Sequence, residues 1–190
     1  MSQLGLRVES PMTLLREYAT CLRALLDGHT VTFHGDYVNL YHARITFPPT
    51  RAAELLMAAT GPRTLELSGQ IADGTILTGG TTPDGVCAAV EYIGRDRRAG
   101  SERQTHDVVA YLPCIIGDDP MREVTAELNA WEFSGNAADL AAFGTPDRIA
   151  TAARRWVDAG VGTLVLQPTP TTDPVEFVTA VATRIQPLIS

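Results

Sequence analysis

Apolar residues recur at every third or fourth position between residues 11 and 28, which is the spacing of one buried helix face. Ser10 and Pro11 begin this pattern with a capping residue and a proline at the first helical position, where its missing N–H has no cost. Gly28 follows the last apolar residue and ends the run. The pattern predicts an amphipathic helix from Pro11 to Gly28.

A second pattern follows, in which β-prone residues flank a short turn. Residues 30–33 and 37–40 are rich in β-branched and aromatic side chains, and His34-Gly35-Asp36 lies between them. This arrangement predicts a small hairpin, which Pro48-Pro49 ends.

From residue 55 onward, short apolar stretches alternate with helical patterns. Strands are expected at residues 55–59, 75–78, 107–116 and 161–166, and helices at residues 62–68, 83–98, from 121, 146–159 and 173–185. Strands separated by helices form right-handed crossovers, so we expect a mainly parallel sheet. Pro113 lies inside the third strand without an N–H for the ladder, which indicates a bulge or an edge position.

The number of these units fits half of a barrel. A complete (β/α)8 barrel takes ~250 residues, whereas this chain has 190 and begins on a helix. A doubly wound sheet would carry G-x-G-x-x-G after its first strand, and the sequence has no such motif there. We therefore expect an α/β fold, a partial TIM (β/α)8 barrel. It would hold about the last four βα units after a helix and a β-hairpin, in a single domain over residues 1–190.

Composition narrows the class of protein. Hydrophobic residues make up 45% of the chain and charged residues 19%, which excludes a disordered polymer. No apolar run reaches the ~18 residues of a membrane span, and the start at Met1 lacks the layout of a signal peptide, so we expect a cytoplasmic protein with no membrane partner. The net charge of −7 argues against nucleic acid as a partner.

Cysteine, histidine and lysine usage excludes several chemistries. The chain has no lysine, so no Schiff base can form. The residues considered as nucleophiles or metal ligands are Cys21, Cys87, Cys114, His29, His34 and His42. The cysteines sit in apolar stretches and are expected to be small buried residues. The histidine spacings of five and eight match no metal motif, so we expect solvated histidines and no metal.

Two glycine-containing turns follow the first two expected strands. They contain Thr60, Gly61 and Pro62 in one case and Thr78, Gly79 and Gly80 in the other. Glycine lets backbone amides approach an anion, a helix that begins at proline directs unpaired N–H groups toward it, and threonine adds hydroxyl donors. The same residues also make ordinary tight turns. Both interpretations stay open, because both turns are expected at the same edge of the sheet.

Five further residues are candidates for a role at the site, and four of them have two interpretations each. Asp73 is expected to form a turn. Asp118 and Asp119 follow a strand end and are expected to cap the next helix, although they are also placed to reach a substrate. Trp131 and Phe133 are expected in the core, with the covering of a ligand as the alternative.

Several segments together resemble the luciferase-like monooxygenase family in order and spacing over nearly the whole chain. They are Pro11 to Gly28, Val31 to Tyr37, Ala58 to Pro62, Ala72 to Gly74, and Gly144 to Asp147. The resemblance implies a (β/α)8 barrel that binds reduced FMN or the deazaflavin F420 at the carboxyl ends of its strands. The match begins after the family's fourth strand, so we expect barrel strands one to four to be absent.

The resemblance also implies a role for both turns. Ala59, Thr60, Gly61 and Pro62, with Thr78, Gly79 and Gly80, would hold the phosphate end of the cofactor, largely through backbone. The family's catalytic groups come from the first half, so none is assigned here. Thr81 stands where members that act on sugar phosphates place a lysine, which argues against such a substrate.

Two functions follow as expectations. The first is an oxidoreductase that acts on a small molecule, by hydride transfer with F420 or by oxygen-dependent oxidation with reduced FMN. In it, this chain supplies the phosphate-binding half. The alternative is a catalytically inactive half-barrel that oligomerises with itself or pairs with a missing N-terminal half, because open strand edges favour association.

Overall fold

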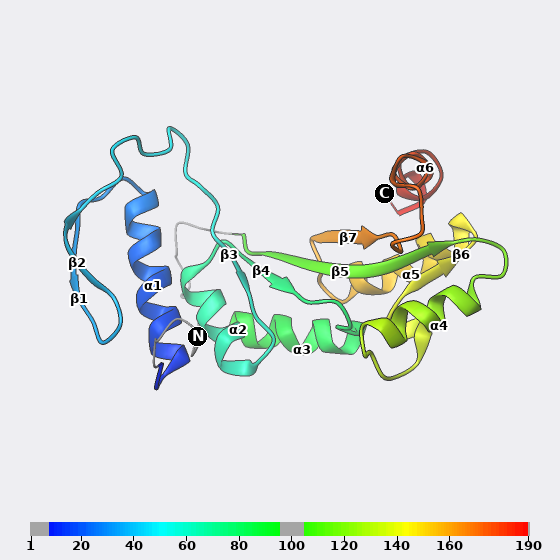
Figure 1. Cartoon of the computed structure of the whole chain (residues 1–190), viewed down its shortest axis with the longest axis horizontal. Coiled ribbons are helices and arrows are strands. Elements are labelled where there is room, and N and C mark those ends of the chain that lie inside the picture. Colours follow the sequence, from blue (N-terminus) through cyan, green and yellow to red (C-terminus); the bar gives the residue numbers. More distant parts are fainter. Residues whose placement is uncertain (1–7, 96–104, 190) are drawn as a thin grey trace.

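The computed structural model describes residues 8–95 and 105–189, and in it a hairpin and an upright helix stand beside a parallel sheet (Figure 1). Helix α1 (Pro11–Leu26) is capped as expected, since the Ser10 side chain accepts a hydrogen bond from the Thr13 N–H at 3.3 Å. Strands β1 (Val31–His34) and β2 (Asn39–Ala43) form the predicted antiparallel hairpin.

The remainder alternates strands and helices, as predicted. Within the described residues the sheet contains β3 (Leu56–Ala58), β4 (Gly74–Leu77), β5 (Asp107–Ile116), β6 (Ala142–Gly144) and β7 (Thr163–Gln167), all paired in parallel. The helices are α2 (Pro62–Ile71), α3 (Pro83–Gly94), α4 (Met121–Ala130), α5 (Pro146–Asp158), α6 (Pro174–Ala180) and α7 (Gln186–Ile189), with a 3-10 turn (Ala137–Asp139) and a π-helical turn (Val181–Ile185). The fold is therefore the expected α/β partial barrel. Strand β6 was not predicted.

Strand β5 is the central strand of the sheet, and its pairing shows which neighbouring strand Pro113 contacts. Residues Val109 and Ala110 of β5 pair with both β4 and β7, so that part of the strand is internal, whereas Pro113 pairs on the β7 side alone within the described residues. Pro113 pairs with Gln167 of β7 in an unshifted register, so the bulge interpretation is wrong. The proline lies after the segment of β5 that pairs with β4 and before the segment that pairs with β6.

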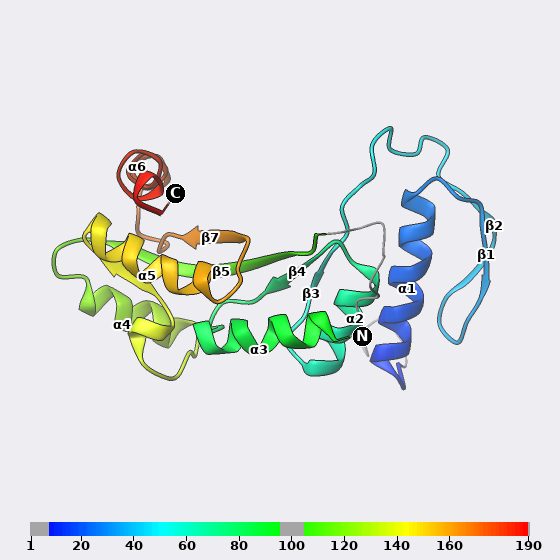
Figure 2. The same cartoon turned by 180° about the vertical axis from the view of Figure 1, so that it is seen from behind.

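One side of the sheet carries the main core. Helices α2 and α3 lie along this side (Figures 1 and 2), and Leu77, Ala110 and Leu112 are buried with Trp156 of α5 in one cluster, whereas α4 packs in a second cluster. On β3 the alternation is plain, because Met57 is 6% exposed whereas its neighbour Leu56 is 39% exposed. The views from both sides show no helix of the described chain over the opposite face of β3 and β4.

Two polar contacts fix α1 between the hairpin and the sheet. The Glu17 carboxylate accepts hydrogen bonds from the backbone of the hairpin turn, which includes Tyr37. Arg23 forms an ion pair with Asp73, and the Asp73 carboxylate also accepts the Leu55 N–H at 2.7 Å. Asp73 therefore does more than form a turn, since it joins the start of β3 to α1.

Two sequence expectations are wrong. Cys87 is exposed, because the buried face of α3 takes Val86 and Ala89 instead, while Cys21 and Cys114 are buried as predicted. The N-cap of α4 is Pro120 and no side chain caps it, so Asp118 and Asp119 do not have the expected capping role.

The sequence expectations also cover the histidines and the ends of the described segments. The three histidines at 29, 34 and 42 are exposed, although His34 and His42 belong to strands. The chain start at Met1–Arg7 and the expected end of the third helix, residues 96–98, lie outside the described residues. In the part of the chain that the structure describes, no helix has the length and apolar character needed to cross a membrane.

Candidate functional site

The two glycine turns lie next to each other at one edge of the sheet. Strands β3 and β4 are parallel neighbours, with Ala58 opposite Ile76, and the turns follow their carboxyl ends. The Ala59 N–H extends this ladder by donating to the Ile76 carbonyl at 3.1 Å. The structure therefore brings together the residues that sequence reasoning selected, and Ala59 anchors the first turn as a buried residue.

The second turn presents free backbone donors. The Thr81 N–H donates to the Thr78 carbonyl at 3.3 Å and closes a β-turn in which Gly80 has φ +83°. Glycine suits this position because other residues rarely adopt positive φ. Within the described residues, the N–H groups of Gly79 and Gly80 donate to no other group. Two adjacent amides without acceptors are the chemistry that an anion requires.

The first turn is more self-contained. The Gly61 N–H donates to the Thr64 hydroxyl at 3.2 Å, and that hydroxyl donates back to the Gly61 carbonyl at 2.8 Å. Thr60 is exposed, and the first turn of α2 begins with Pro62 directly behind it. This turn therefore offers the Thr60 hydroxyl and the positive end of the α2 dipole rather than the Gly61 amide.

A buried tryptophan holds the second turn in place. Trp156 of α5 is fully buried, and its indole N–H donates to the Thr81 carbonyl at 2.9 Å. Directly after the turn, the Thr82 hydroxyl accepts the Gly85 N–H at 3.1 Å and caps α3. The turn is thus fixed on both sides, which keeps its free amides in one orientation.

Phe133 lies against the same turn. A β-carbon built at Gly80 would be 2.9 Å from a ring carbon of Phe133, and one built at Gly79 would be 3.2 Å from another. The ring of Trp131 stacks on that of Phe133, with centroids 6.1 Å apart and planes inclined by 19°. Phe133 also packs against a second core cluster, and Trp131 is 57% exposed, so the expectation of core packing holds for Phe133 alone.

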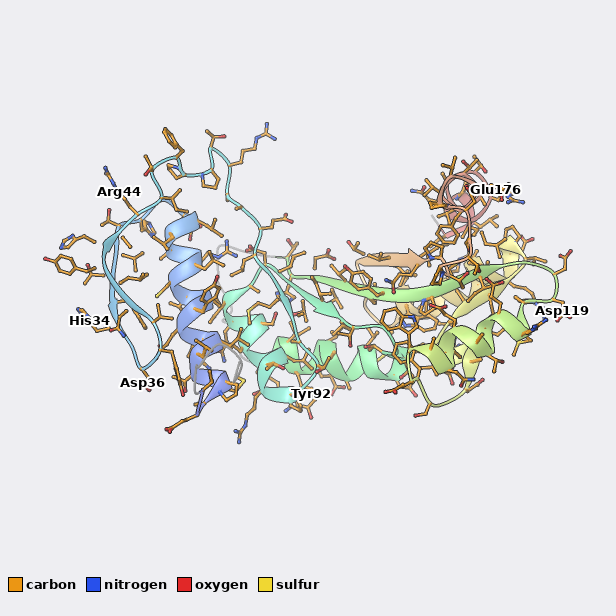
Figure 3. All side chains as sticks on the ribbon, viewed as in Figure 1. His34, Asp36, Arg44, Tyr92, Asp119 and Glu176 are labelled. Carbon is orange, nitrogen blue, oxygen red and sulfur yellow. The ribbon has the colours of Figure 1, made fainter. Side chains whose placement is uncertain are left out.

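A separate hollow of about 630 Å³ lies beyond the end of β5. Its lining includes Asp118, Asp119, Asp147, Arg148 and Arg155. The two adjacent aspartates therefore border a pocket between α4 and α5 instead of capping a helix. Asp119 lies at the opposite end of the molecule from the labelled hairpin residues (Figure 3).

The cysteines add no nucleophile to this region. Burial raises the pKa of the Cys114 thiol to about 12. Burial, with the negative charge of Glu17, also raises the pKa of Cys21. The described residues contain no group of three His, Cys, Asp or Glu side chains that could hold a metal ion.

Comparison with known proteins identifies the family of this chain. The luciferase-like monooxygenase family matches residues 1–142, and the chain is therefore a member of it. In sequence, the chain is 28% identical over 123 residues to the 5,10-methylenetetrahydromethanopterin reductase of Methanolobus tindarius. That alignment covers 65% of this chain and 37% of the reductase, so the chain matches little more than a third of the relative's length.

Solved structures give the same fold. An F420-dependent secondary alcohol dehydrogenase in complex with an F420–acetone adduct superimposes with a TM-score of 0.78 at 16% identity, over 98% of this chain and 64% of that one. The riboflavin lyase RcaE, solved with modified FMN, gives a TM-score of 0.72 at 13% identity, over 99% of this chain and 60% of that one. At these identities the likeness concerns the fold.

Proposed function

We propose that this chain is the cofactor-phosphate-binding half of a luciferase-like oxidoreductase that uses F420 or FMN. The observation that carries the proposal is the pair of adjacent amides at Gly79 and Gly80, beside the turn at Thr60, which donate to no acceptor in the described part of the chain. Family membership supports it, and so do relatives that are named for F420 and for FMN. The chain, residues 1–190, would act as one domain of the barrel.

The residues present fit the anionic end of such a cofactor. The Gly79 and Gly80 amides would donate to phosphate oxygens, and the hydroxyls of Thr60 and Thr78, both exposed, would add neutral donors. The dipole of α2, which begins at Pro62, favours negative charge at this position. When bound, the deazaflavin or flavin supplies the hydride or oxygen chemistry, and the protein orients it.

No acid or base is assigned for the reaction on a small-molecule substrate. The two turns themselves supply threonine hydroxyls and backbone amides, and Cys114 of β5 is buried with a raised pKa. The intact activity therefore requires residues beyond those that border the two turns. We propose that they come from the other half of a closed barrel.

A second candidate function has its own observation. Leu56 is 39% exposed and Ala58 is exposed on the uncovered face of β3, so apolar surface is open to solvent at a sheet edge. Such a face favours association. The alternative is therefore a non-catalytic half-barrel that pairs with a second copy or with an N-terminal half.

Titration of the 190-residue chain with F420 and with FMN separates the two candidates. The first predicts saturable quenching of cofactor fluorescence at a stoichiometry of one per chain. Absence of any spectral change with either cofactor contradicts it. Light scattering on the same sample measures whether the chain associates, which the second candidate requires.

A further inference from the structure

The end of α4 folds back over the second glycine turn. Trp131 caps the helix, and the Phe133 N–H then donates to the Leu128 carbonyl at 2.9 Å. This backbone return places the phenyl ring of Phe133 against Gly79 and Gly80. The Phe133 ring therefore covers the side of the turn to which side chains at positions 79 and 80 would point.

Trp131 extends the apolar surface outward. Its indole N–H donates to the Glu127 carboxylate at 2.7 Å, which satisfies the polar edge of the ring and fixes its orientation. The ring stacks on Phe133 and remains 57% exposed. An exposed, oriented tryptophan beside a second aromatic ring is a surface to which a flat apolar molecule binds well.

The backbone between the two rings is strained. Glu132 has φ +56°, a conformation that costs a non-glycine residue free energy and that helix ends normally assign to glycine. The strained residue directs both flanking rings to one surface.

We propose that Trp131 and Phe133 form the subsite for the substrate, and that this substrate is an uncharged molecule with a planar aromatic or apolar part. The assignment of this subsite to the substrate rests on the proposed function, because it takes the neighbouring glycine turn to hold the cofactor. The Glu127 carboxylate, which accepts the Trp131 indole N–H, lies beside the ring and disfavours an anion at this subsite.

A matched pair of ligands tests the proposal on the 190-residue chain. The probes are 4-nitrobenzyl alcohol and 4-nitrobenzyl phosphate, which differ in charge and quench tryptophan emission on contact. The chain has two tryptophans, and Trp156 is fully buried, so the change in emission reports on Trp131. Trp131→Phe identifies the signal, Phe133→Leu removes the second ring, and Tyr41→Ala is the control at an exposed aromatic residue of the hairpin.

We expect saturable quenching by the alcohol that Trp131→Phe abolishes. Calorimetry with the same alcohol should show roughly 2- to 10-fold weaker binding to Phe133→Leu and unchanged binding to Tyr41→Ala. With saturating inorganic phosphate present to occupy the neighbouring glycine turn, the phosphate ester should bind at least about tenfold more weakly than the alcohol. Non-saturating quenching, equal binding of both probes, or an unchanged Phe133→Leu variant overturns the proposal.

An FMN titration of the same samples keeps this result separate from the proposed function. Alcohol binding with no FMN binding supports the aromatic subsite and contradicts the cofactor turn. FMN binding with no alcohol binding contradicts the aromatic subsite and leaves the cofactor turn supported.

Discussion

The phenyl ring of Phe133 and the backbone of Gly80 are in direct contact, and a β-carbon at Gly80 would lie 2.9 Å from the ring. This contact joins the end of α4 to the turn after β4, two segments that the sheet alone does not connect. Gly80 also has φ +83°. The position therefore has two independent reasons to be glycine, and both bear on the turn that we propose for the cofactor.

Gly80→Ala should destabilise the protein by about 2 kcal/mol, because alanine is strained at positive φ and its methyl group displaces Phe133. Urea unfolding measures the change. Gly94→Ala is the matched control, since a β-carbon there meets nothing within 4 Å. That helical replacement should stabilise by about 0.5–1 kcal/mol. Equal effects of the two variants would contradict the assignment of strain to Gly80.

The ion pair between Arg23 and Asp73 should be important for docking α1. Their side chains are 11% and 19% exposed, and Arg23 also donates to the Ala53 carbonyl at 3.0 Å. Asp73→Asn leaves a buried guanidinium with less compensation and should cost about 3 kcal/mol. The double variant with Arg23→Met should cost less than the sum of the single changes. Strict additivity in chemical denaturation would argue against coupling.

Acid should release the hairpin turn from α1. The N–H of Tyr37 lowers the pKa of the Glu17 carboxyl, against the opposing effect of burial, and the N–H groups of Val38 and Asp36 add to the lowering. A carboxyl whose folded pKa is depressed stabilises fully above its ordinary value of 4.5, and this contribution is lost as the pH falls through the folded pKa.

Amide exchange of the turn measures this effect. Protection factors of residues 36–38 should be high at neutral pH and low at about pH 3. Glu17→Gln should lower them at neutral pH as well. Protection that does not change between the two pH values would refute the role of Glu17.

Thiol labelling should distinguish the three cysteines of the chain. Cys87 is exposed and should react with a disulfide reagent at neutral pH, whereas burial keeps Cys114, with its pKa of about 12, as an inert thiol. Cys21 is also buried and has a raised pKa. One thiol should therefore react in the folded chain and three after unfolding. Loss of the fast reaction in Cys87→Ser completes the test.

Elements with local signals were predictable from the sequence. Ser10 and Pro11 predict the start of α1. The structure confirms it with a hydrogen bond between residues three positions apart, from the Thr13 N–H to the Ser10 side chain. Strand β6 has three residues, and its pairing of Ala142 with Cys114 joins positions far apart in the chain, so no local pattern reveals it. The same holds for the contact of Phe133 with Gly80.

The errors have equally physical causes. Cys87 stands in an apolar stretch, but the helical period buries Val86 and Ala89 and turns the residue between them to solvent. Asp118 and Asp119 precede a proline that takes the capping position itself. An apolar sequence neighbourhood therefore does not determine whether a side chain is buried, because the register of the helix decides which face it occupies. In the same way, a residue type that favours capping does not cap unless it stands at the N-cap position of the helix.

The position of the phosphate is the central claim, and amide chemical-shift mapping of the 190-residue chain with FMN and with riboflavin tests it most directly. We predict that FMN shifts the backbone amides of Gly79 and Gly80, and that riboflavin, which lacks the phosphate, leaves them in place. Shifts that are the same for both ligands, or that fall instead on the pocket around Asp118 and Arg148, would contradict the account.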